Sequence, residues 1–187
     1  MVFIENNNKI ETEIQKEPGF MMNQGLFSPE LLNHKNRFEV IYKDIPVLLT
    51  DKKIYHAEEA EKILKTALQA GFKSICIIAK DFIGKAPETF IANHSKGVIK
   101  VVLIKDDKND IEDIAIYLGG EVIRDKAGSF VTNLTEKNFV IANQVYADPK
   151  KTILTPKVLG SKALKELVVA LKKEQAKDKD NKELKRR

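Results

Sequence analysis

The alternation of apolar and polar positions is clearest in residues 74–105, where it predicts a strand, a helix and a second strand. Residues 75–79 and 98–104 are short apolar runs rich in isoleucine and valine, a pattern typical of strands covered on both faces. Between them, Pro87 suits a first helical turn and Gly97 stands where a helix usually ends. Two buried strands joined by a helix are expected to be parallel, with a right-handed crossover. The pattern therefore predicts an α/β fold with a βαβ unit at its centre.

The segments on either side add a long helix and several shorter elements. Residues 55–70 carry apolar side chains at three- and four-residue spacing and are followed by Gly71, which predicts a helix. Residues 38–50 predict two strands, with a turn at Lys43 and Asp44 and an edge position at Pro46. Further helices are expected at 109–118 and 161–173, and further strands at 121–124, 139–146 and 152–154.

The N-terminal part has a weaker pattern. Residues 2–17 alternate around three consecutive asparagines, which predicts a hairpin that needs a partner surface to be stable. Pro18 and Gly19 interrupt it and mark a boundary or hinge. Residues 20–32 are apolar without a clear period, and they are expected either to join the core or to line an exposed groove.

Length and composition indicate one ordinary domain with a hydrophobic core. The chain has 187 residues, of which 43% are hydrophobic and 32% charged, and no apolar run is long enough to cross a bilayer. The net charge of +5 belongs to residues 161–187, which hold ten basic and five acidic residues. These charges alternate in sign and no aromatic residue lies among them, which favours a solvated helix face over a nucleic-acid arm. We therefore expect neither a nucleic acid nor a membrane as partner.

Several aspartates follow predicted strands and raise one catalytic hypothesis. Carboxylates at strand ends can hold Mg²⁺ for phosphoryl transfer or hydrolysis, with a nearby lysine as the cation. The residues concerned are Asp51, Asp81, Asp106 and Asp107, with Lys52, Lys53 or Lys105. No glycine-rich phosphate loop accompanies them, and such residues are also common at strand ends because they solvate loops.

The single cysteine and the three histidines give no further chemistry. Cys76 lies within a predicted buried strand, so we interpret it as a small core residue, and no disulfide is possible within the chain. His34, His56 and His94 lack metal-ligand spacing and are expected at surface or helix-cap positions.

Four strings, in the same order, resemble the apical domain of GroEL-type (group I) chaperonins. They are, in chain order, the apolar segment from Gly19 to Asn33, PVLLTDKKI, the run from LQAGFKSICIIAKDF through NHSKGVIKVVLIK, and EDIAIYLGGEVI. The resemblance covers most of residues 3–187. It implies an apical α/β domain at 19–160, a strand or hairpin at 1–18 like the junction with the intermediate domain, and a helical C-terminal segment at 161–187 of the same domain.

The resemblance also implies a function. The family's apical domain binds non-native polypeptide and the mobile loop of the co-chaperonin in a hydrophobic groove between two helices. Carried over by position, the binding residues here are Leu26, Leu31, Leu64, Ile91, Ala92 and Asn93, with Gly19 as the hinge. At Glu30, Glu61 and Pro87 the family has large apolar residues, so this chain departs from it and altered client recognition is implied.

Partners and cofactors follow from the same resemblance. The expected partners are non-native polypeptides, a co-chaperonin and, in the full-length protein, other chaperonin subunits in a heptameric ring. No catalysis and no cofactor are expected of these 187 residues, which match an excised apical domain; ATP and Mg²⁺ are expected only in the full-length protein. An interaction module that no longer binds unfolded chains is the remaining alternative. The Lys- and Asn-rich composition favours an organelle matrix, plastid-type or mitochondrial, over a bacterial cytoplasm.

Overall fold

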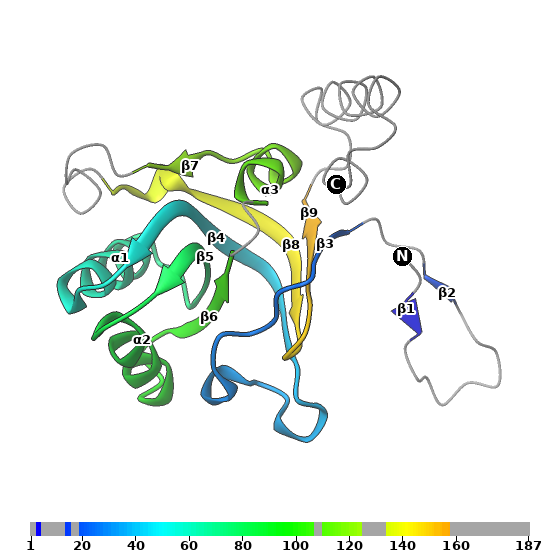
Figure 1. The fold of residues 1–187 in the computed structure, drawn as a ribbon, viewed down its shortest axis with the longest axis horizontal. Coiled ribbons are helices and arrows are strands. Elements are labelled where there is room, and N and C mark those ends of the chain that lie inside the picture. Colours follow the sequence, from blue (N-terminus) through cyan, green and yellow to red (C-terminus); the bar gives the residue numbers. More distant parts are fainter. Residues whose placement is uncertain (1–2, 5–13, 16–18, 107–109, 125–133, 158–187) are drawn as a thin grey trace, which may run out of the picture.

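The computed structural model describes residues 3–4, 14–15, 19–106, 110–124 and 134–157. The expected α/β fold is confirmed: three helices pack on a seven-stranded sheet (Figure 1). The strands are β1 (Phe3–Ile4), β2 (Ile14–Gln15), β3 (Phe20–Met22), β4 (Val40–Ile54), β5 (Ser74–Phe82), β6 (Lys100–Lys105), β7 (Val122–Ile123), β8 (Phe139–Ala147) and β9 (Thr152–Pro156). The helices are α1 (Ala57–Gln69), α2 (Ala86–Ser95) and α3 (Ile111–Leu118), with 3₁₀ turns η1 (Pro29–Leu31), η2 (Lys35–Arg37) and η3 (Glu136–Asn138).

The sheet has a parallel half and an antiparallel half. Its strand order is β3-β9-β8-β4-β5-β6, with β7 added to β4. The β4–β5 and β5–β6 pairs are parallel, as the βαβ pattern predicted, whereas β8, β9 and β3 run antiparallel to their neighbours. The two helices that cover the parallel half are therefore the connections between consecutive parallel strands.

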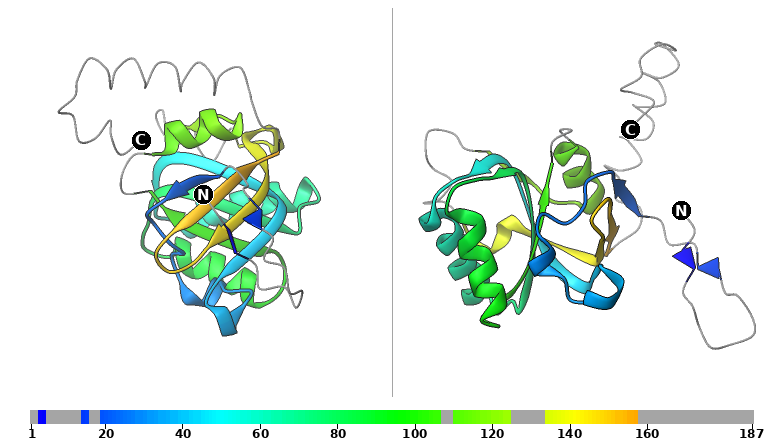
Figure 2. Two further views of the ribbon diagram at one scale, coloured as in Figure 1. Left: turned by 90° about the vertical axis from the view of Figure 1, so that its right-hand side faces the viewer. Right: turned by 60° about the horizontal axis from the view of Figure 1, so that its bottom comes forward.

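Alternating side chains of the central strands build two separate cores. On β5, Ile75 and Ile77 pack beneath α1 and α2, while Cys76 and Ile78 pack with α3 on the opposite face. Figures 1 and 2 show α1 and α2 together on one side of the sheet and α3 on the other. Cys76 is fully buried, as expected, and burial raises the pKa of its thiol.

One sequence prediction about β4 is wrong. Residues 38–50 do not form two strands with a turn, because Val40 to Ile54 is one long strand at the centre of the sheet. Asp44 has a φ of 49° and is left out of the pairing with β8, but Lys43 and Ile45 on either side of it pair in the same register, so the strand continues. Pro46, which we expected at an edge, lies just before the point at which β5 begins to pair with β4.

The remaining elements agree with the predicted ones to within a few residues. β1 and β2 pair antiparallel, with Phe3 opposite Gln15, as expected for the N-terminal hairpin. Gly119, with a φ of 74°, ends α3 as predicted. The predicted asparagine turn and the helix at 161–173 lie outside the described residues. None of the described helices is long and apolar enough to span a membrane.

Candidate functional site

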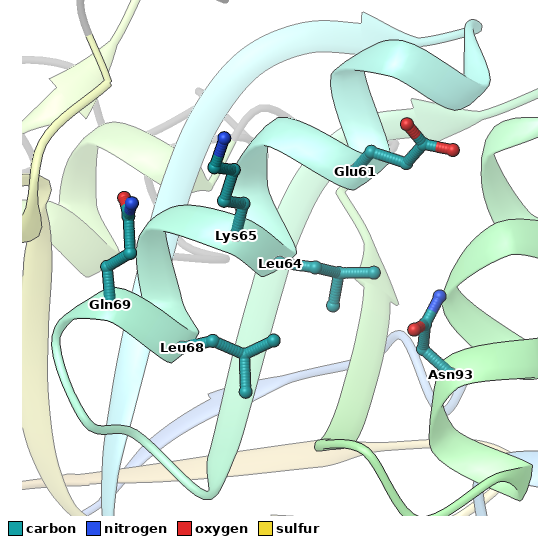
Figure 3. Close-up of a pocket in the computed structure, with 6 residues that line it drawn as sticks. All are labelled: Glu61, Leu64, Lys65, Leu68, Gln69 and Asn93. Carbon is teal, nitrogen blue, oxygen red and sulfur yellow. The ribbon is translucent and has the colours of Figure 1, made fainter.

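An open depression lies between α1 and α2. Its volume is about 410 Å³, and five of its six lining residues come from α1. We call it the α1–α2 groove; it is lined by Glu61, Leu64, Lys65, Leu68, Gln69 and Asn93 (Figure 3). The five residues from α1 are spaced three or four apart, which places them on neighbouring turns of one face of the helix.

The floor of the groove is apolar. Leu64 is only 4% exposed and belongs to the core beneath the helices, so it offers the groove an edge of its side chain. Leu68, one turn further along α1, is 42% exposed and points in Figure 3 to the same side as Leu64. A half-exposed leucine beside a buried one is apolar surface that no part of the described chain covers.

The polar residues of the groove are arranged unequally. In Figure 3 the Lys65 and Gln69 side chains point away from α2, whereas the Glu61 carboxylate points toward it. The Asn93 Nδ2 donates one hydrogen bond to the Thr89 carbonyl within α2, at 2.8 Å, and its Oδ1 remains available as an acceptor. The groove thus presents hydrogen-bond acceptors above an apolar floor.

Buried aromatic rings hold α2 in position. Phe90 is completely buried under the helix and meets Phe82 of β5 edge-on, with ring centroids 6.2 Å apart. Phe27, which lies just before η1, also packs on Phe82, with ring centroids 5.3 Å apart. These rings belong to the same core as Leu64 of the groove, so the position of α2 beside α1 depends on that core.

The C-terminal turn of α2 is fixed by a histidine. His94 is 6% exposed, and its Nδ1 accepts a hydrogen bond from the Val101 N–H of β6 at 3.0 Å. Burial, together with the charge of Lys100, lowers the pKa of His94. The expectation of a surface or cap position for His94 is therefore wrong: the imidazole faces inward and replaces a strand partner at the sheet edge.

The start of α1 is fixed by Glu59. Its carboxylate accepts the backbone N–H groups of Tyr55 and His56, at 2.9 and 3.1 Å, and pairs with Lys52 at 2.6 Å. Burial alone raises the pKa of a carboxyl, but Lys52 and the two N–H donors outweigh it and lower the pKa of Glu59. Lys52, which the catalytic hypothesis considered, serves here to anchor the helix.

The structure gathers three of the predicted binding or altered positions around the groove. Leu64, Asn93 and Glu61 line it. The other predicted positions lie elsewhere: Leu31 is fully buried, Leu26 and Ile91 are half-buried against the core, and Ala92 and Glu30 are exposed outside the lining. Pro87 lies in the first turn of α2, as expected.

Gly19, the predicted hinge, enters the sheet beside β9. A Cβ added there meets the Ile153 side chain at 2.7 Å, so close packing explains the glycine. Its proposed role in hinge motion stays a prediction.

The strand-end aspartates have other partners. Asp81 pairs with Lys105 at 3.1 Å, and Asp51 lies 3.7 Å from Arg124. The Asp106 carboxylate accepts the N–H groups of Asp110 and Ile111 and so caps α3. Asp107 lies outside the described residues, within which no cluster of three or more metal-ligating side chains occurs.

Sequence reasoning missed half of the groove lining. Leu68, Lys65 and Gln69 were assigned to the helix but not to the site. The signal that was available is spacing: Leu68 follows Leu64 by four residues and therefore extends the same stripe.

Comparison with known proteins finds similarity to chaperonins in both sequence and fold. No protein-family model matches the chain. Chaperonin GroEL from Methanoregula boonei is 28% identical over 160 residues, which cover 82% of this chain and 30% of that protein. The crystal structure of the chaperonin gp146 from bacteriophage EL 2 (Pseudomonas aeruginosa), determined in the presence of ATP-BeFx, has a similar fold. Its TM-score is 0.69 at 14% identity, and the match covers 93% of this chain and 36% of that one. The chain thus spans about a third of the length of either protein.

Proposed function

We propose that this chain, a divergent chaperonin-type domain, binds short segments of non-native polypeptide in the α1–α2 groove. Similarity in sequence to GroEL supports a role in the chaperone family. The observation that carries the finer proposal is Leu68, a leucine left 42% exposed in the floor of an open depression between two helices. Peptide binding by apical domains is what the family resemblance implies, and the groove lies between the two helices that the resemblance selects.

The physical basis is incomplete burial. Apolar surface gains about 25 cal/mol for each Å² removed from water, so a segment that covers Leu68 and the edge of Leu64 gains free energy whatever its detailed sequence. The groove is open to solvent, and extended peptide segments are among the ligands that such helix-lined apolar surfaces bind. In the full-length protein, the proposal includes a co-chaperonin loop as a second occupant, a ring of subunits and ATP with Mg²⁺ bound elsewhere.

One observation favours a second candidate, an interaction module with a restricted set of partners. Glu61 is exposed and places a carboxylate at the rim, where the family has a large apolar residue. Covering a carboxylate without a compensating partner costs free energy, which disfavours purely apolar clients.

The test is a binding titration with a matched pair of variants. A fluorescently labelled, chemically denatured model protein and a labelled co-chaperonin loop peptide are titrated with the chain and with Leu68→Ser. We expect Leu68→Ser to weaken binding about five- to tenfold, because about 1 kcal/mol of apolar burial is lost. Met21→Ser is the control, since Met21 is 46% exposed but belongs to β3 at the far edge of the sheet (Figure 1). Equal losses of affinity in both variants, or no binding by the parent chain, would contradict the proposal that the α1–α2 groove binds these ligands.

A further inference from the structure

Among the described residues that line the groove, Glu61 is the one acidic residue. It is exposed, and its carboxylate makes no ion pair or hydrogen bond with any residue that the structure describes. Lys65 follows it by four residues, a spacing at which the two side chains can pair. In Figure 3, however, Lys65 points away from α2 while Glu61 points toward it. The negative charge therefore remains available to a molecule in the groove.

The opposite wall also offers a hydrogen-bond acceptor. Asn93 donates one of its two Nδ2 hydrogens to the Thr89 carbonyl within α2, and its Oδ1 remains able to accept a hydrogen bond from a ligand. The groove then offers a carboxylate and an amide oxygen, both of which accept hydrogen bonds, above the leucine floor. A ligand matches this arrangement when it brings an apolar side chain together with a cationic donor.

We propose that Glu61 determines specificity, so that the groove selects segments in which a Lys or Arg accompanies the apolar residue that packs on Leu68. The inference rests on the proposed function and names its preferred client chemistry. Glu61 and Leu68 are seven residues apart, or roughly 10 Å along a helix, and an extended chain advances roughly 3.3 Å per residue. The cationic residue is therefore expected about two to four positions from the apolar anchor.

Desolvation explains why the charge selects and does not merely weaken binding. A wholly apolar segment covers the Glu61 carboxylate and removes water without replacing its hydrogen bonds, which is unfavourable. A Lys or Arg on the ligand restores them as charge-assisted hydrogen bonds, which are shorter and stronger than neutral ones. An acidic ligand has both the desolvation cost and repulsion.

The experiment compares three labelled peptides by fluorescence anisotropy with the whole chain. All carry the same leucine anchor, and they differ only in having Lys, Gln or Glu three positions away. We expect the Lys peptide to bind about fivefold tighter than the Gln peptide, and the Glu peptide to bind most weakly. The preference should shrink as salt is raised, because screening shortens the range of the Glu61 charge.

Two variants separate the carboxylate from the general charge of the domain. Glu61→Gln keeps the shape of the side chain, so we expect the three peptides to bind it alike, with the leucine still required. Glu136→Gln, in η3 and outside the groove lining, is the control and should keep the ranking.

The outcomes distinguish this inference from the proposed function. If the three peptides bind the parent chain equally and Leu68→Ser weakens all of them, the groove stands and the role of Glu61 is overturned. A Lys preference that survives Glu61→Gln also overturns that role. If none of the peptides binds the parent chain, the proposed function fails, and the inference fails with it.

Discussion

The α1–α2 face and the α3 face of the sheet are built from alternate residues of the same strands, yet the helices that cover them leave different outer surfaces. On the α3 face, Asp106 caps the start of the helix, Gly119 ends it, and Arg124 pairs with Glu112 on its outer side. On the α1–α2 face, two helices lie side by side and Leu68 stays half-exposed between them. The strands are equally apolar on both faces, so the opening arises from how the helices pack.

This difference indicates where binding is possible. In α3, Ile116 and Tyr117 are half-buried and none of the apolar residues is exposed. Two neighbouring helices, by contrast, leave a furrow wherever their side chains are too short or point apart. Lys65 and Gln69 turn outward from that furrow, and Leu68 is left exposed within it (Figure 3). The comparison therefore predicts that damage to the α1–α2 face affects binding and damage to the α3 face does not.

Phe90→Ala gives the largest expected effect on the α1–α2 face. Phe90 is fully buried, so its loss should lower the free energy of unfolding by about 3–5 kcal/mol through lost apolar contact and a cavity. The cavity lies under α2, so peptide affinity should also fall in the fraction that remains folded. Urea denaturation and anisotropy measure the two effects separately.

Ile114→Ala is the counterpart on the α3 face. Ile114 is also fully buried, and its truncation should cost about 2–5 kcal/mol while leaving peptide affinity of the folded protein unchanged. If Phe90→Ala keeps full peptide affinity, or Ile114→Ala loses it, the assignment of peptide binding to the α1–α2 face alone is wrong.

Asp106→Ala gives an intermediate effect on the α3 face. Its carboxylate accepts two backbone N–H groups at 3.1 and 3.0 Å in a buried site, so both donors lose their partner in this variant. We expect a loss of about 1–3 kcal/mol in the free energy of unfolding. Hydrogen exchange should become faster in the first turn of α3 and stay unchanged in α1 and α2. Faster exchange across both faces would show that the faces are not separate units.

Much of this architecture was predictable from local pattern. Parallel β5 and β6, the helix α1 and the glycine stop after α3 follow from apolar runs, helical spacing and glycine position, which act over a few residues. The long β4 was not predicted, because the polar pair Lys43 and Asp44 looks like a turn in the sequence, and Asp44 does adopt a turn-like φ of 49°. It continues as a strand only because β8 pairs on both sides of it.

The site was predictable only in part, for a similar reason. Spacing and family resemblance select Leu64, Asn93 and Glu61, but the exposure of a side chain depends on what the neighbouring helix covers. Leu31 and Leu68 are both leucines in apolar segments, and the first is fully buried while the second is 42% exposed. That distinction is set by tertiary packing between α1, α2 and η1, which no single segment of sequence specifies.

The smallest expected effect is a pH dependence that belongs to the α1–α2 face. His94 has a lowered pKa in the folded state, so between its folded and ordinary values the unfolded chain binds a proton that the folded chain does not. Stability is therefore full above the ordinary histidine pKa of about 6.5 and falls as pH decreases toward the folded pKa, by at most about 1.4 kcal/mol per pH unit.

Since His94 accepts the Val101 N–H, its protonation should release the end of α2 from β6. His94→Asn, which keeps a short acceptor but cannot titrate, should flatten this part of the pH profile in urea denaturation. If the free energy of unfolding of His94→Asn depends on pH as steeply as that of the parent chain, the acid sensitivity belongs to other groups and is not specific to the α1–α2 face.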